Sequence, residues 1–419
     1  MNEQILVIWR GLMEMGTQHL AKQLYQEAER FFDQSAALAQ QLQVPEIKAF
    51  TIRLLATSRV KLGQLDLAEN GFREALGICE EIQNGKGMSE AWAGLASVAV
   101  AKGSLTDAQQ GYERSIAIYP KSSPPLRLGM LYSDLGQVYA ALKNWPKAER
   151  AYIRAKELCQ RYGYPKGEGE LNVLLGEIYY RQGRKKSALF WVGEACKQFA
   201  RIGENAAMAS SLQYQAFLHY DMGDMSDAAI SQGRAVILWM ELGEITEITE
   251  GCYFLSKILQ NLGEIEEAEN YLTISIVNYQ KQDIGLALRY QSLAGLAVLR
   301  HDLTKAEEHY RKALKLFETL DDQSKVSEIF ESLAYVAEAT GREHEALYFH
   351  ERSCLTMGSE LRSSGAVQKL GRFYENAHAY FEALHTYWQA MKFAKDLGEN
   401  VEEIERSIQR VSRRIRQKH

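Results

Sequence analysis

The stretch LGQVYAALKNWPKAERAYIRA, residues 135–155, contains the pattern that decides the fold. Its small residues are Gly136, Ala148 and Ala155, and the aromatic Tyr152 lies between the last two. On both sides of the KNWPK segment, apolar residues recur at steps of three and four, which is the spacing of one buried face on an α-helix. The stretch therefore predicts two helices that are joined by a short turn and pack through small residues.

The same pattern recurs along nearly the whole chain of 419 residues. Alanines equivalent to Ala148 are first spaced by 40 residues, and the last three follow at 38, 40 and 37. They are Ala28, Ala68, Ala108, Ala148, Ala188, Ala228, Ala268, Ala306, Ala346 and Ala383. A period of this length predicts a solenoid, in which each repeat packs only on its neighbours.

Other positions of the repeat are equally restricted. Twelve residues before the alanine, the chain has Gly16, Ala56, Ala96, Gly136, Gly176, Ala216, Ser256, Ala294, Ala334 and Gly371. Four residues after it, the residue is mostly aromatic: Phe32, Phe72, Tyr112, Tyr152, Tyr310 and Tyr387. Small residues are expected where two helices approach most closely, with the aromatic ring filling the space beside them.

Glycines at a fixed place predict where the first helix of each repeat ends. Five residues before the alanine stand Gly63, Gly103, Gly183, Gly223, Gly263 and Gly341. We expect each to adopt a left-handed conformation at the helix end. Repeat 8 has His301 at this place instead.

This pattern resembles the tetratricopeptide repeat (TPR) family, whose consensus runs L-G-x-x-Y, then G-x-Y-x-x-A, then F-x-x-A. The resemblance covers roughly residues 5–395. Most TPR units have about 34 residues, and the longer unit is similar to arrays in Pins-type polarity adaptors, kinesin light chains and bacterial peptide-pheromone receptors. The resemblance implies an all-α, right-handed superhelical solenoid of about ten helix-turn-helix repeats plus a C-terminal capping helix.

The chain divides into three parts on this interpretation. Residues 1–120 form repeats 1–3, residues 121–395 form repeats 4–10 continuous with the first three, and residues 396–419 form a capping helix with a basic tail. The stretch YPKSSPPLR at 119–127 is either a stiff joint or an ordinary turn ended by proline. The repeat register passes through it unbroken, which favours the turn.

The C-terminal segment carries a narrow apolar stripe at steps of four and three. Its members are Leu397, Val401, Ile404, Ile408, Val411 and Ile415. A solenoid needs a terminal helix to cover its last core, so the stripe predicts a cap. The alternative is a short coiled-coil seam that would make a homodimer. The arginines of this segment share the helix with Glu402, Glu403 and Glu405, which favours a solvated face over a nucleic-acid or membrane contact.

Repeat 6 departs most from the pattern. Gln215 replaces the usual leucine, and Gln232 replaces the aromatic residue. Buried amides need hydrogen-bond partners. The repeat is therefore either a locally looser unit or a flexible, ligand-facing centre.

Composition excludes several classes of partner. There are 49 basic and 54 acidic side chains, a net charge of −5, so no nucleic acid or membrane partner is expected. No stretch approaches the roughly 20 apolar residues of a membrane span, and the start of the chain lacks the features of a signal peptide. The five cysteines form no C-x-x-C pair, which predicts reduced thiols and a cytoplasmic location.

No catalytic constellation is present. The nine histidines are dispersed without H-E-x-x-H spacing, and the chain has no G-x-S-x-G, Walker-type loop or G-x-G-x-x-G. We expect no catalytic residue, no metal and no cofactor.

The family resemblance implies a concave groove lined by the first helix of each repeat. In repeats 5–8 the exposed positions of that face include Tyr180, Arg181, Gln213, Phe217, Tyr220, Tyr253, Lys257, Asn261 and Gln291. Aromatic rings supply contact area, and amides can hydrogen-bond a peptide backbone in either sense. Repeats 1–3 present small residues there, with only Arg53 and Lys61 charged, so we expect a ligand over the middle and C-terminal repeats.

These observations favour a non-enzymatic protein–protein interaction scaffold that binds a peptide segment of a partner protein in the groove. The alternative is a peptide-responsive regulatory sensor of the pheromone-receptor type. Such receptors usually carry an N-terminal effector module, and here the first repeat already occupies residues 5–40, so the sensor would lack an effector domain.

Overall fold

The computed structural model describes residues 2–356, 364–376, 378–397 and 400–418, and these form 21 α-helices. Their bounds are α1 Asn2–Ala21, α2 Tyr25–Leu42, α3 Pro45–Lys61, α4 Leu65–Glu81, α5 Gly85–Ala101, α6 Leu105–Ile118, α7 Pro125–Ala141, α8 Trp145–Arg161, α9 Pro165–Arg181, α10 Lys185–Ile202, α11 Asn205–Met222, α12 Met225–Leu242, α13 Ile245–Leu262, α14 Ile265–Asn278, α15 Ile284–Leu299, α16 Leu303–Thr319, α17 Gln323–Ala339, α18 Glu343–Thr356, α19 Ser364–Asn376, α20 Tyr380–Leu397 and α21 Glu402–Lys418. Within these described ranges, no helix is both long and apolar enough to cross a membrane.

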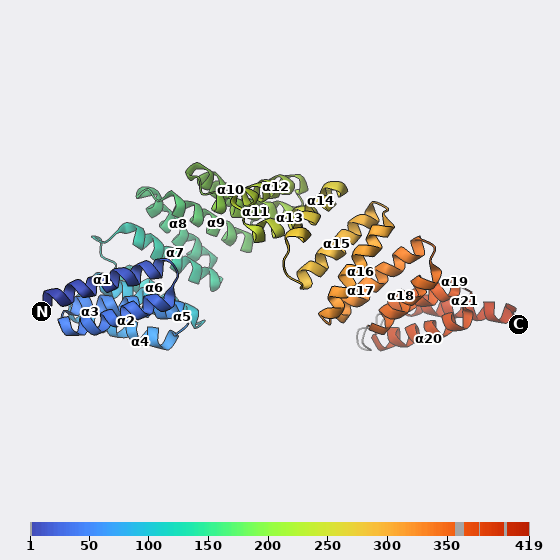
Figure 1. Ribbon diagram of the computed structural model, residues 1–419, viewed down its shortest axis with the longest axis horizontal. Coiled ribbons are helices and arrows are strands. Elements are labelled where there is room, and N and C mark those ends of the chain that lie inside the picture. Colours follow the sequence, from blue (N-terminus) through green and yellow to red (C-terminus); the bar gives the residue numbers. More distant parts are fainter. Residues whose placement is uncertain (1, 357–363, 377, 398–399, 419) are drawn as a thin grey trace. The chain divides into compact units, whose positions relative to one another are not determined.

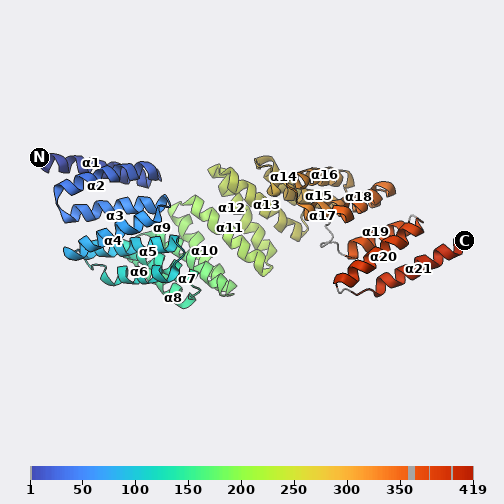
Figure 2. The same ribbon diagram turned by 90° about the horizontal axis from the view of Figure 1, so that it is seen from below.

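The helices belong to two compact blocks, an N-terminal block of residues 1–218 and a C-terminal block of residues 219–419, and the boundary falls inside α11. Within each block, consecutive helices pack as antiparallel pairs (Figure 1). In the N-terminal block, α1 to α4 are stacked in the order of the chain (Figure 2). The prediction of an all-α solenoid of about ten helix-turn-helix repeats with a terminal cap is thereby confirmed.

The small residues of the repeat lie where the sequence pattern predicts. All ten alanines of the defining column have no exposed surface. A Cβ atom added to Gly136 would lie 2.4 Å from a ring carbon of Tyr152, and one added to Gly16 would lie 2.6 Å from the ring of Phe32. The glycine therefore leaves the space that the aromatic ring of the second helix occupies.

The predicted helix-ending glycines all adopt positive φ. The angle ranges from 72° at Gly341 to 89° at Gly223. Lys143 and His301 occupy the same place in their repeats, with φ of 58° and 59°. A side chain in this left-handed region costs free energy that glycine avoids, so these two turns are strained.

Two second helices, α6 and α14, end early and are followed by an extended tyrosine. The hydroxyl of Tyr119 donates to the carbonyl oxygen of Pro124 at 2.7 Å, and the hydroxyl of Tyr279 donates to Asp283 Oδ1 at 2.7 Å. Each tyrosine thereby closes the turn to the next helix. The proline-rich stretch thus forms a turn inside the N-terminal block, and the subdivision of the chain at residue 120 stays a prediction.

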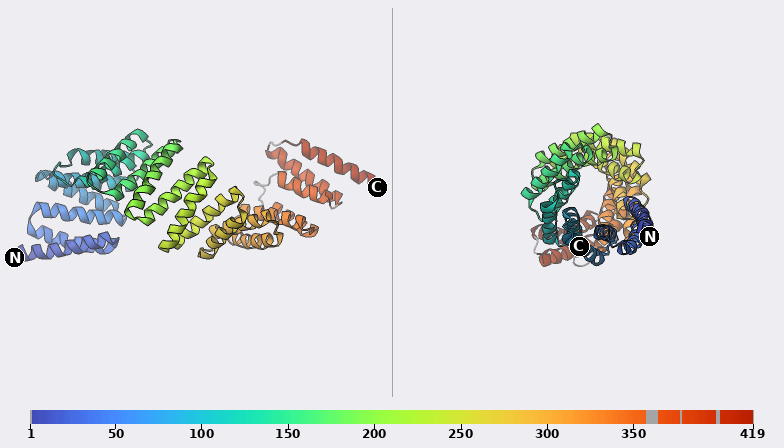
Figure 3. Two further views of the ribbon diagram at one scale, coloured as in Figure 1. Left: turned by 90° about the horizontal axis from the view of Figure 1, so that it is seen from above. Right: turned by 90° about the vertical axis from the view of Figure 1, so that its left-hand side faces the viewer.

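Helix α21 covers the last repeat. Ile404, Ile408 and Val411 are buried in a core shared with α20, and α21 lies beside α20 (Figure 3). Arg410 donates to both carboxylate oxygens of Glu375 at 2.8 and 2.9 Å. The apolar stripe that would form a coiled-coil seam is therefore already buried within the chain. The side chain of Leu397 lies outside the described residues.

Each of the two core amides of repeat 6 makes one hydrogen bond, while the buried Oε1 of Gln232 has no partner. Gln232 is fully buried and donates to the carbonyl oxygen of Gly251 at 3.0 Å. Gln215 is partly buried and accepts from the Cys196 thiol at 3.7 Å. Cys196 is buried, as are Cys79, Cys159 and Cys252; the side chain of Cys354 lies outside the described residues.

Candidate peptide-binding surface

The nine predicted binding residues all come from first helices of repeats. We call the partly or fully exposed faces of these helices the first-helix surface. In the N-terminal block, α9 carries Tyr180 and Arg181, and α11 carries Gln213 and Phe217. In the C-terminal block, the last turn of α11 carries Tyr220, α13 carries Tyr253, Lys257 and Asn261, and α15 carries Gln291. The residues thus form two groups, one in each block.

The group in the N-terminal block is centred on aromatic rings. Tyr180 meets Phe217 edge to face, with ring centroids 5.4 Å apart, and Phe217 stacks on Tyr214 at 6.2 Å. Phe217 remains 38% exposed, which is unusual for a ring in contact with two others. Gln213 is partly buried on the same helix. Tyr180 and Phe217 therefore lie in contact and offer an exposed aromatic edge.

Beside this group, helices α7, α8 and α9 enclose a cavity of about 440 Å³, which we call the α7–α9 pocket. Its lining residues are Gln137, Ala140, Ala141, Lys143, Trp145, Tyr152, Leu174, Glu177, Ile178 and Arg181. Ala140 and Ala141, which stand one repeat before the larger Tyr180 and Arg181, both line the pocket. Burial raises the pKa of Tyr152 at its base, which keeps this phenol neutral.

The rim of the α7–α9 pocket is polar. Arg181 and Glu177 form an ion pair at 3.5 Å, and both side chains are more than half exposed. Gln137 and Lys143 are exposed at the same rim. With two cations against one carboxylate, the rim carries a net positive charge. An apolar base with a few polar groups at its mouth is the usual composition of a binding pocket.

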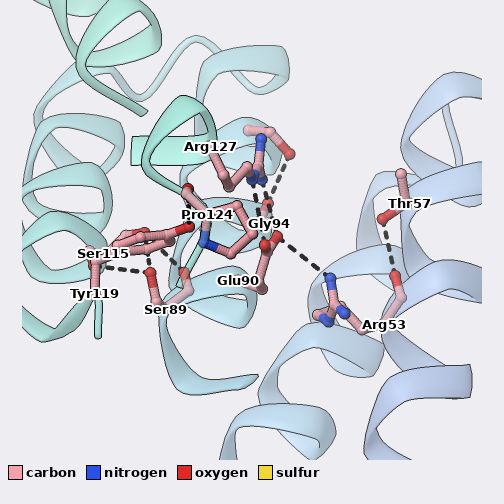
Figure 4. A network of polar contacts seen from close by, with 10 residues as sticks. Arg53, Thr57, Ser89, Glu90, Gly94, Ser115, Tyr119, Pro124 and Arg127 are labelled. Carbon is pink, nitrogen blue, oxygen red and sulfur yellow. Dashed lines mark hydrogen bonds and ion pairs between the residues drawn. The ribbon is translucent and has the colours of Figure 1, made fainter. Parts of the chain in front are cut away.

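The N-terminal repeats hold a partly buried ionic bridge that the sequence pattern did not reveal (Figure 4). Glu90 of α5 accepts from Arg53 of α3 at 3.3 Å and from Arg127 of α7 at 2.9 and 3.3 Å. Burial lowers the pKa of Arg53, while Glu90 acts in the opposite direction. The bridge ties three successive first helices together.

The expectation that Arg53 and Lys61 are the only charges applied to repeats 1–3, and within these repeats Glu90 adds a partly buried carboxylate. Arg127 and Asp134 of α7, in repeat 4, lie near this group. Burial raises the pKa of Asp134, and Arg127 and Lys61 oppose that effect. The signal that could have found the bridge is its spacing, because Glu90 and Arg127 stand close to one repeat apart.

In the C-terminal block the predicted residues contact one another in pairs. Asn261 Nδ2 donates to the Tyr220 hydroxyl at 3.4 Å, and Lys257 Nζ lies 4.3 Å from the centre of the Tyr253 ring. Gln291 Nε2 donates to a carboxylate oxygen of Glu328 at 2.6 Å. These contacts align Tyr220, Asn261 and Lys257 on neighbouring helices, while the amide nitrogen of Gln291 is already engaged.

A buried arginine behind this group also escaped the sequence analysis. Arg289 is 2% exposed, and its guanidinium donates to Glu250 at 2.6 Å and to Ser275 Oγ at 2.8 Å. It also lies 4.5 Å from the Tyr253 ring centre and 4.2 Å from that of Tyr279. Because two cations already contact Tyr253, this ring is less free to bind a partner than its position suggests.

Two further cavities lie away from the predicted residues. One of about 350 Å³ opens between α4, α5 and α6, where Arg114 already lies 4.5 Å over the ring of Trp92. The other, of about 260 Å³, is lined by residues of α13 and the turn after α14, including Glu250 and Tyr279. Among the residues that the structure describes, no cluster of His, Cys, Asp or Glu could hold a metal ion.

Comparison with known proteins identifies the repeat. Residues 127–201 and residues 249–273 match models of the tetratricopeptide repeat, and no curated protein sequence matches the chain. A similar solved structure is a signal transduction ATPase with numerous domains (STAND) protein with a tetratricopeptide repeat sensor from Pyrococcus horikoshii, with a TM-score of 0.53 at 17% identity over 80% of this chain. The match spans 52% of that protein's chain.

Two other matched structures have TM-scores below that value. The apo form of RapI gives 0.48 at 13% identity, over 64% of this chain and 97% of RapI. The apo form of the quorum sensor NprR from B. thuringiensis gives 0.47 at 14% identity, over 83% of this chain and 98% of NprR. The repeat models match in both blocks, at residues 127–201 and 249–273, so the chain contains tetratricopeptide repeats in each of them.

Proposed function

We propose that this chain is a non-enzymatic interaction scaffold that binds a peptide segment of a partner protein along the first-helix surface. The observation that carries the proposal is the α7–α9 pocket, which opens on this surface and has Arg181 at its rim. Its volume of about 440 Å³ lies in the range of ligand pockets, roughly 300–1,000 Å³.

The chemistry around the pocket suits an extended peptide. The exposed edge of Phe217 and the ring of Tyr180 supply apolar contact area at a low cost in side-chain entropy. Gln137 and Gln213 carry amides that can donate to and accept from peptide groups. In the C-terminal block, Lys257 and the Tyr220–Asn261 pair offer a second set of polar contacts.

The proposal is tested by affinity purification from the source cell with mass spectrometry. The test variant combines Tyr180→Ala with Phe217→Ala on the first-helix surface. The matched control combines Ile153→Ala on α8 with Phe190→Ala on α10. These side chains are 37% and 60% exposed and lie on second helices. A partner retained by the wild type and the control but lost by the test variant supports the proposal.

The opposite pattern would contradict it. A partner that the test variant retains and the control loses would place the binding site on the second helices. A third variant, Tyr220→Ala with Asn261→Ala, shows whether the same partner extends onto the C-terminal block. If a bound peptide instead alters the affinity for a separate protein, the chain acts as a peptide-responsive sensor rather than as a scaffold.

A further inference from the structure

The α7–α9 pocket has features that specify which side chain it takes. Its base is formed by the rings of Trp145 and Tyr152 with Leu174 and Ile178, and all four side chains are at least partly buried. A cavity of roughly 150 Å³ lined by apolar groups accommodates benzene. The observed volume of about 440 Å³ therefore has room for a large side chain together with part of the backbone that carries it.

The residues that line this pocket differ from those at the equivalent places of the neighbouring repeats. Its walls at Ala140 and Ala141 are aligned with Tyr180 and Arg181 one repeat later. One repeat earlier, Ala101 occupies the place of Ala141, yet it lines none of the cavities described above. The hollow therefore depends on the combination of two alanines with the Trp145 ring, and not on a small residue alone.

The rim adds a preference for charge. Glu177 is paired with Arg181, whereas Lys143 has no ion-pair partner among the residues described. Lys143 stands at the turn between α7 and α8, where its exposed side chain is at the mouth of the pocket. An acidic residue of a bound segment would gain a charge partner there without displacing an existing pair.

We propose that the α7–α9 pocket is the anchor of the bound segment, and that it receives one aromatic or large aliphatic side chain with an acidic residue beside it. The inference rests on the proposed function, because it requires a peptide on the first-helix surface. Trp145 and Tyr152 contact the anchor side chain, Gln137 hydrogen-bonds the peptide backbone, and Lys143 pairs with the acidic residue.

The test selects random peptides displayed on phage against the immobilised full chain. Three variants are then compared with the wild type: Ala141→Phe fills the pocket, Lys143→Glu reverses the charge at its rim, and Ala101→Phe is the matched control one repeat earlier. All three positions are exposed at helix ends or turns, so the substitutions leave the core intact. Affinities of the selected peptides are measured by titration, with Trp145 fluorescence as a second readout.

We expect the wild type to select peptides in which a large apolar residue recurs beside Asp or Glu. Ala141→Phe should weaken their binding by about tenfold or more, which is about 1.4 kcal/mol, and Ala101→Phe should not. Lys143→Glu should weaken acidic peptides selectively. Binding should change the emission of the wild type, and Trp145→Phe should remove that change.

Selected peptides that bind the wild type and Ala141→Phe equally would overturn the anchor assignment while leaving peptide binding intact. Selected peptides without a recurring apolar residue would do the same. If no peptide is selected and no partner depends on the first-helix surface, the proposed function itself fails, and the anchor with it.

Discussion

The buried pair of Arg289 and Glu250 allows a quantitative prediction, because its two members differ sharply in exposure. The Arg289 side chain is 3% exposed, whereas that of Glu250 is 50% exposed. The guanidinium also donates to Ser275 Oγ at 2.8 Å and to the carbonyl oxygen of Gly285 at 3.0 Å. Among the described residues, Glu250 is thus the carboxylate that pairs with the buried guanidinium of Arg289.

The exposed fractions of the two side chains imply that replacing Glu250 and replacing Arg289 destabilise the chain by different amounts. Glu250→Met leaves the guanidinium buried without its counter-charge, and breaking a buried pair in this way costs about 3–5 kcal/mol. Since Glu250 is half exposed, we expect the lower end, about 3 kcal/mol. Arg289→Met removes the buried charge and leaves Glu250 free to reach water, so we expect about 1–2 kcal/mol from lost hydrogen bonds and ring contacts.

The double variant separates the pair from its surroundings. Once Arg289 is methionine, Glu250 has no buried charge to neutralise, so Glu250→Met should then cost almost nothing. The double variant should therefore be about as stable as Arg289→Met alone, which corresponds to a coupling energy near 3 kcal/mol. Ser275 is not orphaned in any variant, because its hydroxyl also donates to the Thr249 carbonyl oxygen at 2.7 Å.

The assay must report on this region alone, because a long repeat array does not unfold in one step. Native-state hydrogen exchange with mass spectrometry, read on peptides of α13 to α15, provides the local free energy of opening. A loss of 3 kcal/mol should accelerate exchange there by roughly a hundredfold. Faster exchange in Arg289→Met than in Glu250→Met, or additive effects in the double variant, would refute the argument from desolvation.

Three further predictions concern packing, backbone and charge. Gly136→Ala should destabilise the chain by about 1–3 kcal/mol before the gain in helix propensity is subtracted, because its Cβ would lie 2.4 Å from the facing tyrosine ring. Gly193→Ala, whose Cβ would have nothing within 4 Å, should stabilise the chain by up to about 1 kcal/mol. Urea unfolding compares the two variants. His301→Gly should raise the stability of its turn by about 0.5–1 kcal/mol in local hydrogen exchange, since its φ is 59°. The hydrogen bond from Arg410 lowers the pKa of Glu375, so the ionised carboxylate stabilises α21 at pH values above its usual pKa of 4.5. This stabilisation is lost as the pH falls through the lowered pKa. Acidification should therefore speed hydrogen exchange in α21, after correction for intrinsic rates, and Glu375→Gln should remove that pH dependence.

Most of the fold could be predicted from the sequence because the repeat is specified by local rules. Ala148 and its equivalents mark helix crossings, and the column of Gly136 and its equivalents leaves space for the facing helix. Gly63 and the other turn glycines mark helix ends by their backbone conformation. Each of these signals acts within one repeat, so periodicity alone was sufficient to read them.

The site was harder to predict because it depends on residues from different helices. Tyr180 and Phe217 were predicted only as separate surface positions, and the structure brings their rings into contact. The α7–α9 pocket is lined by the small residues Ala140 and Ala141, which belong to no recognisable sequence motif. The pairing of Arg289 with Glu250 requires knowledge of how deeply each side chain is buried, which a helical pattern does not contain.

The small-residue columns also bear on how this chain can change over evolutionary time. Two positions per repeat, the alanine column and the column twelve residues before it, are restricted to Gly, Ala or Ser and lie where the helices leave little space. Because so few positions are restricted, two arrays can keep the same helix pairs while the residues at almost all other positions differ. The repeat models accordingly match at 127–201 and 249–273, and a fold similar to that of the Pyrococcus protein occurs at 17% identity. In this architecture, the helix pairs require far fewer fixed residues than the chain contains.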